Sequence, residues 1–141
     1  MRLAVVDAST ALAWYLPDEV HARAALRLLD AFDQGRLQLL APGLWEYEVL
    51  NGVTKAASRG RVTSGTGVAT CRRLLGLGIR IIRTLEVELI WRLCVQHSIT
   101  AYDASYLALA EEYGCECYSV DQRLVRAAAD SGLIRWIGEF E

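Results

Sequence analysis

Short apolar runs alternate along this chain with longer segments in which apolar residues recur at helical spacing. The mostly apolar runs lie at 3–6, 37–41, 79–82 and 115–120, and a further run lies at 133–137. Runs of this length are typical of strands that are buried on both faces, as in a parallel sheet. The pattern therefore predicts four strands and a last strand near the C-terminus.

Between these runs the apolar residues recur every three or four positions, which is the spacing of one face of an amphipathic helix. Ser9 or Thr10 is expected to cap the first helix. Thr84 is expected to cap the helix predicted at 86–97, and Thr100 the helix predicted at 101–113, which Gly114 should end. The predicted helices cover about 9–15, 20–32, 42 to the turn at 58–61, 64–75, 86–97, 101–113 and 121–129.

Strands that alternate with helices indicate a parallel sheet covered by helices on both faces. We therefore expect an α/β fold with three layers, α/β/α, and a central, mostly parallel sheet of four to five strands. The sequence contains no internal repeat, low-complexity stretch or Gly/Ser linker. A chain of 141 residues is then predicted to form a single domain over 1–141.

The composition indicates a folded protein without a membrane segment. Hydrophobic residues make up 53% of the chain, which excludes disorder, and no apolar run reaches the roughly 18–20 residues of a membrane span. The N-terminus does not read as a secretory signal. The four cysteines lack the spacing of a zinc site and are expected to be free thiols in a reducing cytoplasm. They are Cys71, Cys94, Cys115 and Cys117.

A net charge of −2 argues against a protein that binds nucleic acid by electrostatics alone. It argues less against a nuclease, because a bound divalent cation supplies local positive charge. The arginines at 72, 73, 80 and 83 form either a local phosphate-binding patch or ordinary solvated helix faces.

Four acidic residues occupy positions that a parallel sheet would bring together. Asp7 follows the first strand and Asp121 the fourth, while Asp103 and Glu48 lie in the first turns of two helices. Ligand sites in open parallel sheets form at the carboxyl ends of the strands, at the point where the strand order reverses. We therefore expect all four carboxylates to face one crevice.

Each of these acids also has a purely structural explanation. Asp7 and Asp121 are suited to cap the helices that follow them, a role worth about 1 kcal/mol. Asp103 would complement a helix dipole, and Glu48 would be an exposed helix residue. For each residue alone the structural explanation is the better one, but the coincidence of all four favours a functional site.

A metal ion would give the four carboxylates a reason to coexist. Crowded carboxylates raise one another's pKa and destabilise the empty site, which a cation relieves. Oxygen ligands suit Mg²⁺ or Mn²⁺, and such an ion lowers the pKa of a bound water and stabilises the transition state of phosphate-ester hydrolysis.

The segments VVDAS, YEVLN, AYDASYLALA and SVDQRL occur in this order over about residues 3–126. The ordered set resembles the PIN domain, and most closely the VapC-type ribonuclease toxins of prokaryotic toxin–antitoxin pairs. The resemblance implies that Asp7, Glu48, Asp103 and Asp121 are the catalytic metal ligands. It also implies supporting roles for Ser9, Asn51 and Ser119, the last at a position where the family often has threonine.

Glu46 is a competing ligand two residues before Glu48. Residues i and i+2 of a helix point roughly 200° apart, so only one of the two faces the site. The motif favours Glu48.

The resemblance further implies a Mg²⁺- or Mn²⁺-dependent endoribonuclease that cleaves single-stranded or loop regions of RNA by metal-activated water. Such a protein is expected to be cytoplasmic, to form a homodimer, and to be neutralised by a cognate VapB-type antitoxin lying in an apolar groove. Trp14, Tyr15, Leu16 and Trp45 either line that groove or are ordinary core residues.

Other classes of protein fit less well. A haloacid-type phosphatase needs a second aspartate where this chain has Ser9, and a receiver domain needs a late lysine, whereas the only lysine is Lys55. The remaining alternative is a catalytically silent PIN-like module that acts as a protein- or RNA-binding partner.

Overall fold

The computed structural model describes residues 1–17 and 19–141, which form a five-stranded sheet flanked by helices. The strand order is β3-β2-β1-β4-β5, and all four neighbouring pairs are parallel. The sheet is therefore wholly parallel in the described part of the chain. The strands are β1 (Arg2–Val6), β2 (Leu37–Pro42), β3 (Arg80–Ile82), β4 (Glu116–Ser119) and β5 (Ile134–Trp136).

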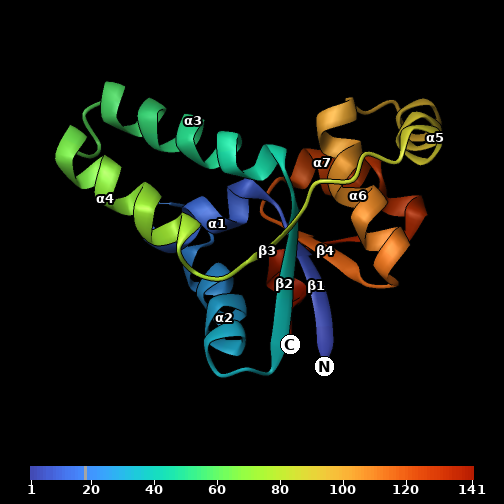
Figure 1. Cartoon of the computed structure of the whole chain (residues 1–141), viewed down its shortest axis with the longest axis horizontal. Helices are drawn as coiled ribbons and strands as arrows, with labels where there is room; N and C mark the ends of the chain where they lie inside the picture. The colour runs from blue at the N-terminus through green and yellow to red at the C-terminus, as the bar shows by residue number, and fades with distance from the viewer. Residues whose placement is uncertain (18) are drawn as a thin grey trace.

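Helices cover both faces of the sheet, which confirms the predicted α/β/α layering. In Figure 1, α1 to α4 lie on one side of the strands and α5 and α6 on the other. None of the helices in the described ranges is long and apolar enough to cross a membrane. The helices are α1 (Ala8–Tyr15), α2 (Ala22–Asp33), α3 (Leu44–Ser58), α4 (Ser64–Leu75), α5 (Val87–His97), α6 (Ala101–Tyr113) and α7 (Gln122–Ala127), with short 3₁₀ turns at Ala129–Ser131 and Ile137–Glu139.

Helix α6 packs against the centre of the sheet, over β1, β2 and β4. Its residues 104–110 are all buried, and three of them are alanines, which let the helix approach the strands closely. Thr100 caps the helix by accepting a hydrogen bond from Asp103 N–H at 3.1 Å, as predicted. Gly114 ends it in the left-handed conformation at φ 64°, also as predicted.

Two of the predicted caps are wrong. Asp7, and not Ser9 or Thr10, is the N-cap of α1, because its extended backbone lets its own carboxylate reach Thr10 N–H. Thr84 does not cap α5, which begins after Glu86 without a side-chain cap.

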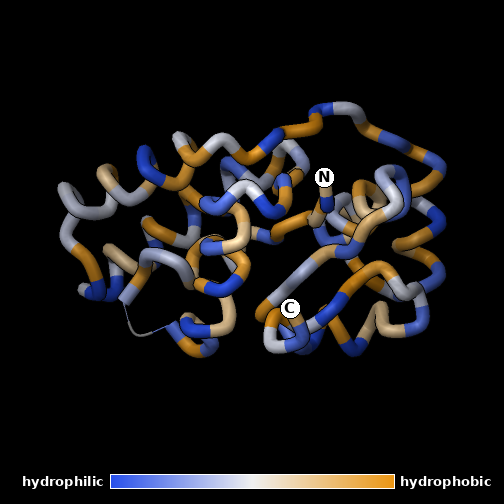
Figure 2. Tube along the Cα trace, turned by 90° about the horizontal axis from the view of Figure 1, so that it is seen from below, coloured by the Kyte–Doolittle hydropathy of each residue, from blue (hydrophilic) through white to orange (hydrophobic). Residues whose placement is uncertain are grey.

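The strand order reverses between β1 and β4. From β1 the chain continues outward through β2 to β3, whereas β4 is followed by β5 on the other side. In Figure 1, β1 runs upward and α6 returns downward, so the end of β1 and the first turn of α6 lie at the same end of the molecule. Both termini lie at the opposite end, which faces the viewer in Figure 2. The carboxyl ends of β1 and β4 therefore form the edge at which a parallel sheet places its ligand sites.

Candidate active site

Asp7 lies directly after β1 and is 5% exposed. Its Oδ1 accepts hydrogen bonds from Thr10 N–H at 3.0 Å and from the Ser9 hydroxyl at 2.8 Å, and its Oδ2 accepts one from the Ser119 hydroxyl. Burial raises the pKa of Asp7 above its ordinary value of 3.8, while these hydrogen bonds act in the opposite direction. Asp7 is thus both a helix cap and a buried, firmly oriented carboxyl group.

Ser119 joins two of the acidic residues. Val6 is paired with Tyr118 across the sheet, so Asp7 and Ser119 follow side by side at the ends of β1 and β4. The Ser119 hydroxyl donates to Asp7 and accepts from Asp121 N–H at 3.0 Å. Asp121 then caps α7 by accepting from Leu124 N–H at 3.2 Å. The register of the two central strands therefore fixes Asp7 and Asp121 relative to each other.

Asp103 is connected to Asp121 by an arginine. The Nη2 atom of Arg123 lies 3.2 Å from Asp103 Oδ2 and 3.4 Å from Asp121 Oδ2. Asp103 projects from the first turn of α6 and Asp121 from the N-cap of α7. The guanidinium thus links the acidic residue of one helix start to that of another.

Glu48 is held by the hydroxyl of Tyr106, which donates a hydrogen bond to its Oε1. Burial is the largest cause that raises the pKa of Glu48, and the charges of Asp7 and Asp103 raise it further, while the hydrogen bond from Tyr106 lowers it. Glu48 therefore lies in the same electrostatic environment as two of the other acids. The pKa of Tyr106 is itself raised, first by burial and then by its hydrogen bond to Glu48.

Glu46 and Asn51 lie apart from the contacts that hold the four acids. Glu46 forms a hydrogen-bonded ion pair with Arg83 at 2.8 Å. Glu48 is instead the glutamate that accepts from the Tyr106 hydroxyl. Asn51 is exposed, and its backbone carbonyl accepts from the Thr54 hydroxyl. The contacts found for Asn51 do not join it to the acidic group.

Sequence reasoning missed two residues of this arrangement, Tyr106 and Arg123. Tyr106 lies inside the buried run 104–110, and a buried tyrosine usually needs a partner for its hydroxyl. That requirement was the available signal, although it does not say which partner is used. Arg123 had only its position two residues after Asp121 as a signal.

The four acidic side chains offer only carboxylate oxygens, a donor set that fits Mg²⁺ or Mn²⁺. Within 1–17 and 19–141, however, no three acidic, histidine or cysteine side chains are placed so that they would hold one ion together. The carboxylates are instead engaged by protein donors: Asp7 by Ser9 and Ser119, Glu48 by Tyr106, and Asp103 and Asp121 by the shared guanidinium of Arg123. Coordination would therefore require some of these side chains to exchange partners.

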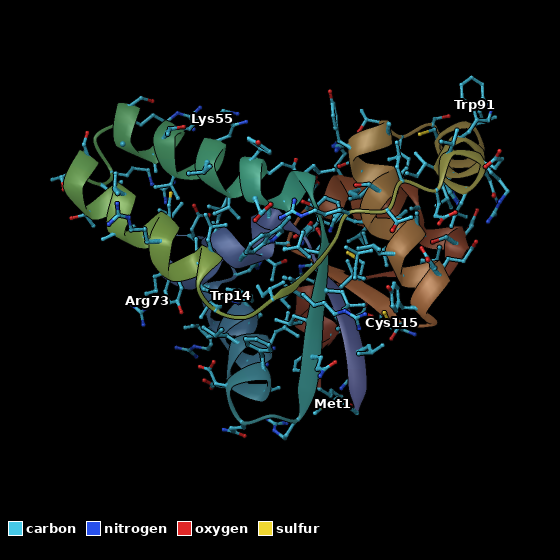
Figure 3. All side chains as sticks on the ribbon, viewed as in Figure 1. Met1, Trp14, Lys55, Arg73, Trp91 and Cys115 are labelled. Carbon is cyan, nitrogen blue, oxygen red and sulfur yellow. The ribbon has the colours of Figure 1, made fainter. Side chains whose placement is uncertain are left out.

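Three of the aromatic and apolar residues considered for a partner groove are core residues. Trp14, Leu16 and Trp45 are all buried, and the Trp14 indole donates to the Ala25 carbonyl at 2.9 Å. Tyr15 is half-buried and lies under the guanidinium of Arg73. Figure 3 shows Trp14 within the body of the molecule.

An apolar groove lies instead between α3 and α4, with a volume of about 590 Å³. Its lining includes Leu50, Val53, Val68, Cys71 and Leu75. Leu50 and Val68 are exposed, so the groove is open to solvent on the outer side of this helix pair.

Three of the four arginines considered as one phosphate-binding patch have separate partners. Arg73 stacks over Tyr15, Arg80 lies 5.7 Å from the ring centroid of Tyr113, and Arg83 pairs with Glu46. Tyr15 ends α1 and Tyr113 ends α6, on opposite sides of the sheet, so these side chains do not form a single patch.

The four cysteines are free, as predicted. Cys71 and Cys117 are buried, and Cys94 and Cys115 are partly buried.

The PIN domain model matches residues 4–130 of this chain. Ribonuclease VapC3 of Pyrobaculum aerophilum is 32% identical over 123 residues, which are 85% of this chain and 90% of that protein. Ribonuclease VapC9 of Mycobacterium tuberculosis is 35% identical over 123 residues, covering 85% and 87% of the two chains. The chain therefore belongs to the PIN-domain family, with relatives among the VapC ribonucleases.

Solved structures agree with this assignment. The structure of PAE2754 from Pyrobaculum aerophilum has a TM-score of 0.70 at 26% identity, covering 96% of this chain and 84% of the other. The structure of Mycobacterium tuberculosis VapC20, described as a sarcin-ricin loop cleaving toxin, has a TM-score of 0.65 at 19% identity and covers 88% and 94%, which is a likeness of fold. The predicted fold family is thus confirmed, and the relatives support nuclease activity.

Proposed function

We propose that this protein is a Mg²⁺- or Mn²⁺-dependent endoribonuclease toxin that cleaves single-stranded or loop regions of RNA and is neutralised by a cognate VapB-type antitoxin. The observation that carries the proposal is that three aspartates are linked in one place: Ser119 connects Asp7 to Asp121, and Arg123 connects Asp121 to Asp103. Glu48 lies close enough for the charges of Asp7 and Asp103 to raise its pKa. The VapC ribonucleases among its relatives support RNA as the substrate.

Asp7, Glu48, Asp103 and Asp121 are the residues that would hold the cation. A bound Mg²⁺ or Mn²⁺ would supply an activated water and neutralise charge on the phosphate in the transition state. The protein's own contribution begins with Ser9 and Ser119, which orient the Asp7 carboxylate, and with Tyr106, which orients Glu48. Such supporting hydrogen bonds fix ligand geometry at metal sites.

The experiment is an RNA cleavage assay with the purified protein and a set of structured RNAs. Cleavage is expected with Mg²⁺ or Mn²⁺ and not with EDTA, and Mn²⁺ is expected to raise the melting temperature because it binds only the folded site. The 5′ ends of the products are mapped by sequencing, with Asp7→Asn as the control for contaminating nuclease. Undiminished cleavage in EDTA would contradict the metal mechanism. Mn²⁺-independent melting together with no cleavage would favour the alternative, a catalytically silent binding module.

We also propose that the protein forms a homodimer through the outer face of α5. Val87, Trp91 and Val95 recur at four-residue spacing on this helix and are all exposed, Trp91 to 72%. Figure 3 shows the Trp91 side chain pointing away from the body of the molecule. A stripe of large apolar side chains of this kind favours burial against a second helix, and a second copy of α5 offers a matching stripe.

The antitoxin is assigned to the groove between α3 and α4. The expected ligand is a short amphipathic segment of the antitoxin whose apolar side chains enter between Leu50, Val68 and Leu75. This groove replaces the surface around Trp14 and Trp45, which is closed by core packing.

A further inference from the structure

Arg123 lies at the rim of the acidic site and contacts two of its carboxylates. A single guanidinium nitrogen is 3.2 Å from Asp103 Oδ2 and 3.4 Å from Asp121 Oδ2. The arginine side chain is 66% exposed, whereas those of Asp103 and Asp121 are 22% and 35% exposed. The positive charge therefore covers the solvent side of two carboxylates that come from different helices.

This contact is suited to exchange. Ion pairs with this degree of exposure are weak and screened by salt, so another cation can replace the guanidinium. The carboxylate oxygens that Arg123 contacts are also those that the proposed divalent cation would use. Two cations repel each other at the same pair of carboxylates. Arg123 and the divalent cation therefore compete for Asp103 and Asp121.

A displaced Arg123 would stay close to the site, because the backbone of α7 holds it two residues after Asp121. Its planar guanidinium presents donors that match a phosphate group, and it keeps its charge at all physiological pH values. The RNA backbone is the anion that the proposed substrate would bring to this rim. The same side chain can thus serve the carboxylates in one state and the substrate in the other.

We propose that Arg123 is an exchange residue: it neutralises Asp103 and Asp121 in the metal-free protein and contacts an RNA phosphate once a divalent cation takes these carboxylates. The inference rests on the proposed function, since it concerns the same site. It also accounts for the side-chain arrangement, in which two of the four acids are held by an internal cation and no three, within 1–17 and 19–141, are placed for one ion.

The first test measures Mn²⁺ binding by isothermal titration calorimetry, without RNA, for the wild type, Arg123→Gln and Arg126→Gln. Arg126 is a matched control, an exposed arginine in the last turn of the same helix. Loss of the competing ion pairs should make Mn²⁺ bind about two- to fivefold more tightly to Arg123→Gln. Arg126→Gln should keep the wild-type affinity. Equal or weaker Mn²⁺ binding by Arg123→Gln would overturn the proposal.

The second test measures binding of a fluorescein-labelled hairpin RNA by anisotropy, in EDTA and in Ca²⁺, at several salt concentrations. In EDTA the wild type and Arg123→Gln should show the same slope of log affinity against log salt, because Arg123 is engaged by the two aspartates and contacts no phosphate. In Ca²⁺ the variant should bind more weakly, and the slope of log affinity against log salt should fall in magnitude by about 0.7, the loss of one phosphate contact. An equal fall of the salt slope in EDTA and in Ca²⁺ would overturn the exchange and leave only a general effect of charge.

The exchange role of Arg123 and the proposed metal-dependent function fail on different results. If Mn²⁺ binds the wild type and Arg123→Gln equally while both cleave RNA, the exchange is wrong and the proposed function stands. If Mn²⁺ binds neither protein, both the exchange and the metal-dependent function are wrong.

Discussion

The hydroxyl of Tyr106 donates a hydrogen bond to the carboxylate of Glu48, although 58 residues separate them in the chain. Tyr106 lies in the buried part of α6 and Glu48 in the second turn of α3, so the bond spans two helices that approach the end of the sheet from different sides. The tyrosine thereby orients the carboxylate and favours its ionised form, which burial and the charges of Asp7 and Asp103 disfavour.

Replacing Tyr106 with phenylalanine should weaken Mn²⁺ binding about tenfold, the lower end of the usual cost of losing a hydrogen bond to a metal ligand. Packing is retained, so the free energy of unfolding should fall by only about 1 kcal/mol. Calorimetry with Mn²⁺ and thermal melts check the two effects. Tyr118→Phe is the control, because it removes the hydroxyl of another buried tyrosine, one that accepts from Arg2 at 2.9 Å. An equal loss of Mn²⁺ affinity in both variants would contradict a specific role for Tyr106.

Glu48→Gln should stabilise the metal-free protein at pH 8, and this gain should shrink as the pH falls. The pKa of Glu48 in the folded protein is raised above 4.5, so folding favours the protonated form. The stabilising contribution of Glu48 is therefore fully present below its pKa in the unfolded chain and is lost as the pH rises through its pKa in the folded protein, where glutamine keeps a neutral side chain. Melting temperatures in EDTA from pH 4.5 to 8 measure the difference, with the exposed Glu112→Gln as control. A gain that grows toward low pH would contradict the prediction.

Asp7→Asn and Asp7→Ala should both abolish cleavage but should differ in stability. Asparagine keeps an oxygen that accepts from Thr10 N–H, whereas alanine removes the cap of α1, at a cost of about 1 kcal/mol. Urea melts in EDTA compare the two variants. Equal stability would show that the cap contributes little, and undiminished cleavage by either variant would remove Asp7 from the proposed catalytic group.

Trp91→Glu should convert the proposed dimer to a monomer, because a charge replaces a large apolar side chain in the proposed interface on α5. Light scattering after gel filtration measures the mass. Val68→Glu, in the groove between α3 and α4, is the matched variant and should remain dimeric.

The same pair of variants tests the antitoxin groove. When each is co-expressed with the product of a small neighbouring gene, Val68→Glu should escape neutralisation and slow growth, whereas Trp91→Glu should remain neutralised. The reverse pattern would place the antitoxin on the outer face of α5, and neutralisation of both variants would contradict the assignment of the antitoxin to the groove between α3 and α4.

Local patterns in the sequence were sufficient for the elements of the fold and for part of the site. Apolar runs and helical spacing predicted the strands and helices, because burial on a parallel sheet imposes these periods on each segment separately. The placement of Asp7 and Asp121 at strand ends followed from the rule that parallel strands share a carboxyl edge. The resemblance to the PIN domain supplied the preference for Glu48 over Glu46.

Contacts between distant segments were decided only by the tertiary structure. The pairing of Val6 with Tyr118 brings Ser119 to Asp7, and the packing of α6 brings Tyr106 to Glu48. Helix packing also buries Trp14 and Trp45. These residues belong to the core and do not line the partner groove that the sequence allowed for them. Periodicity reports which face of a segment is buried but not against what. Sequence by itself therefore determined which carboxylates share an edge, and the strand register and helix packing decided which hydroxyl or guanidinium holds each of them.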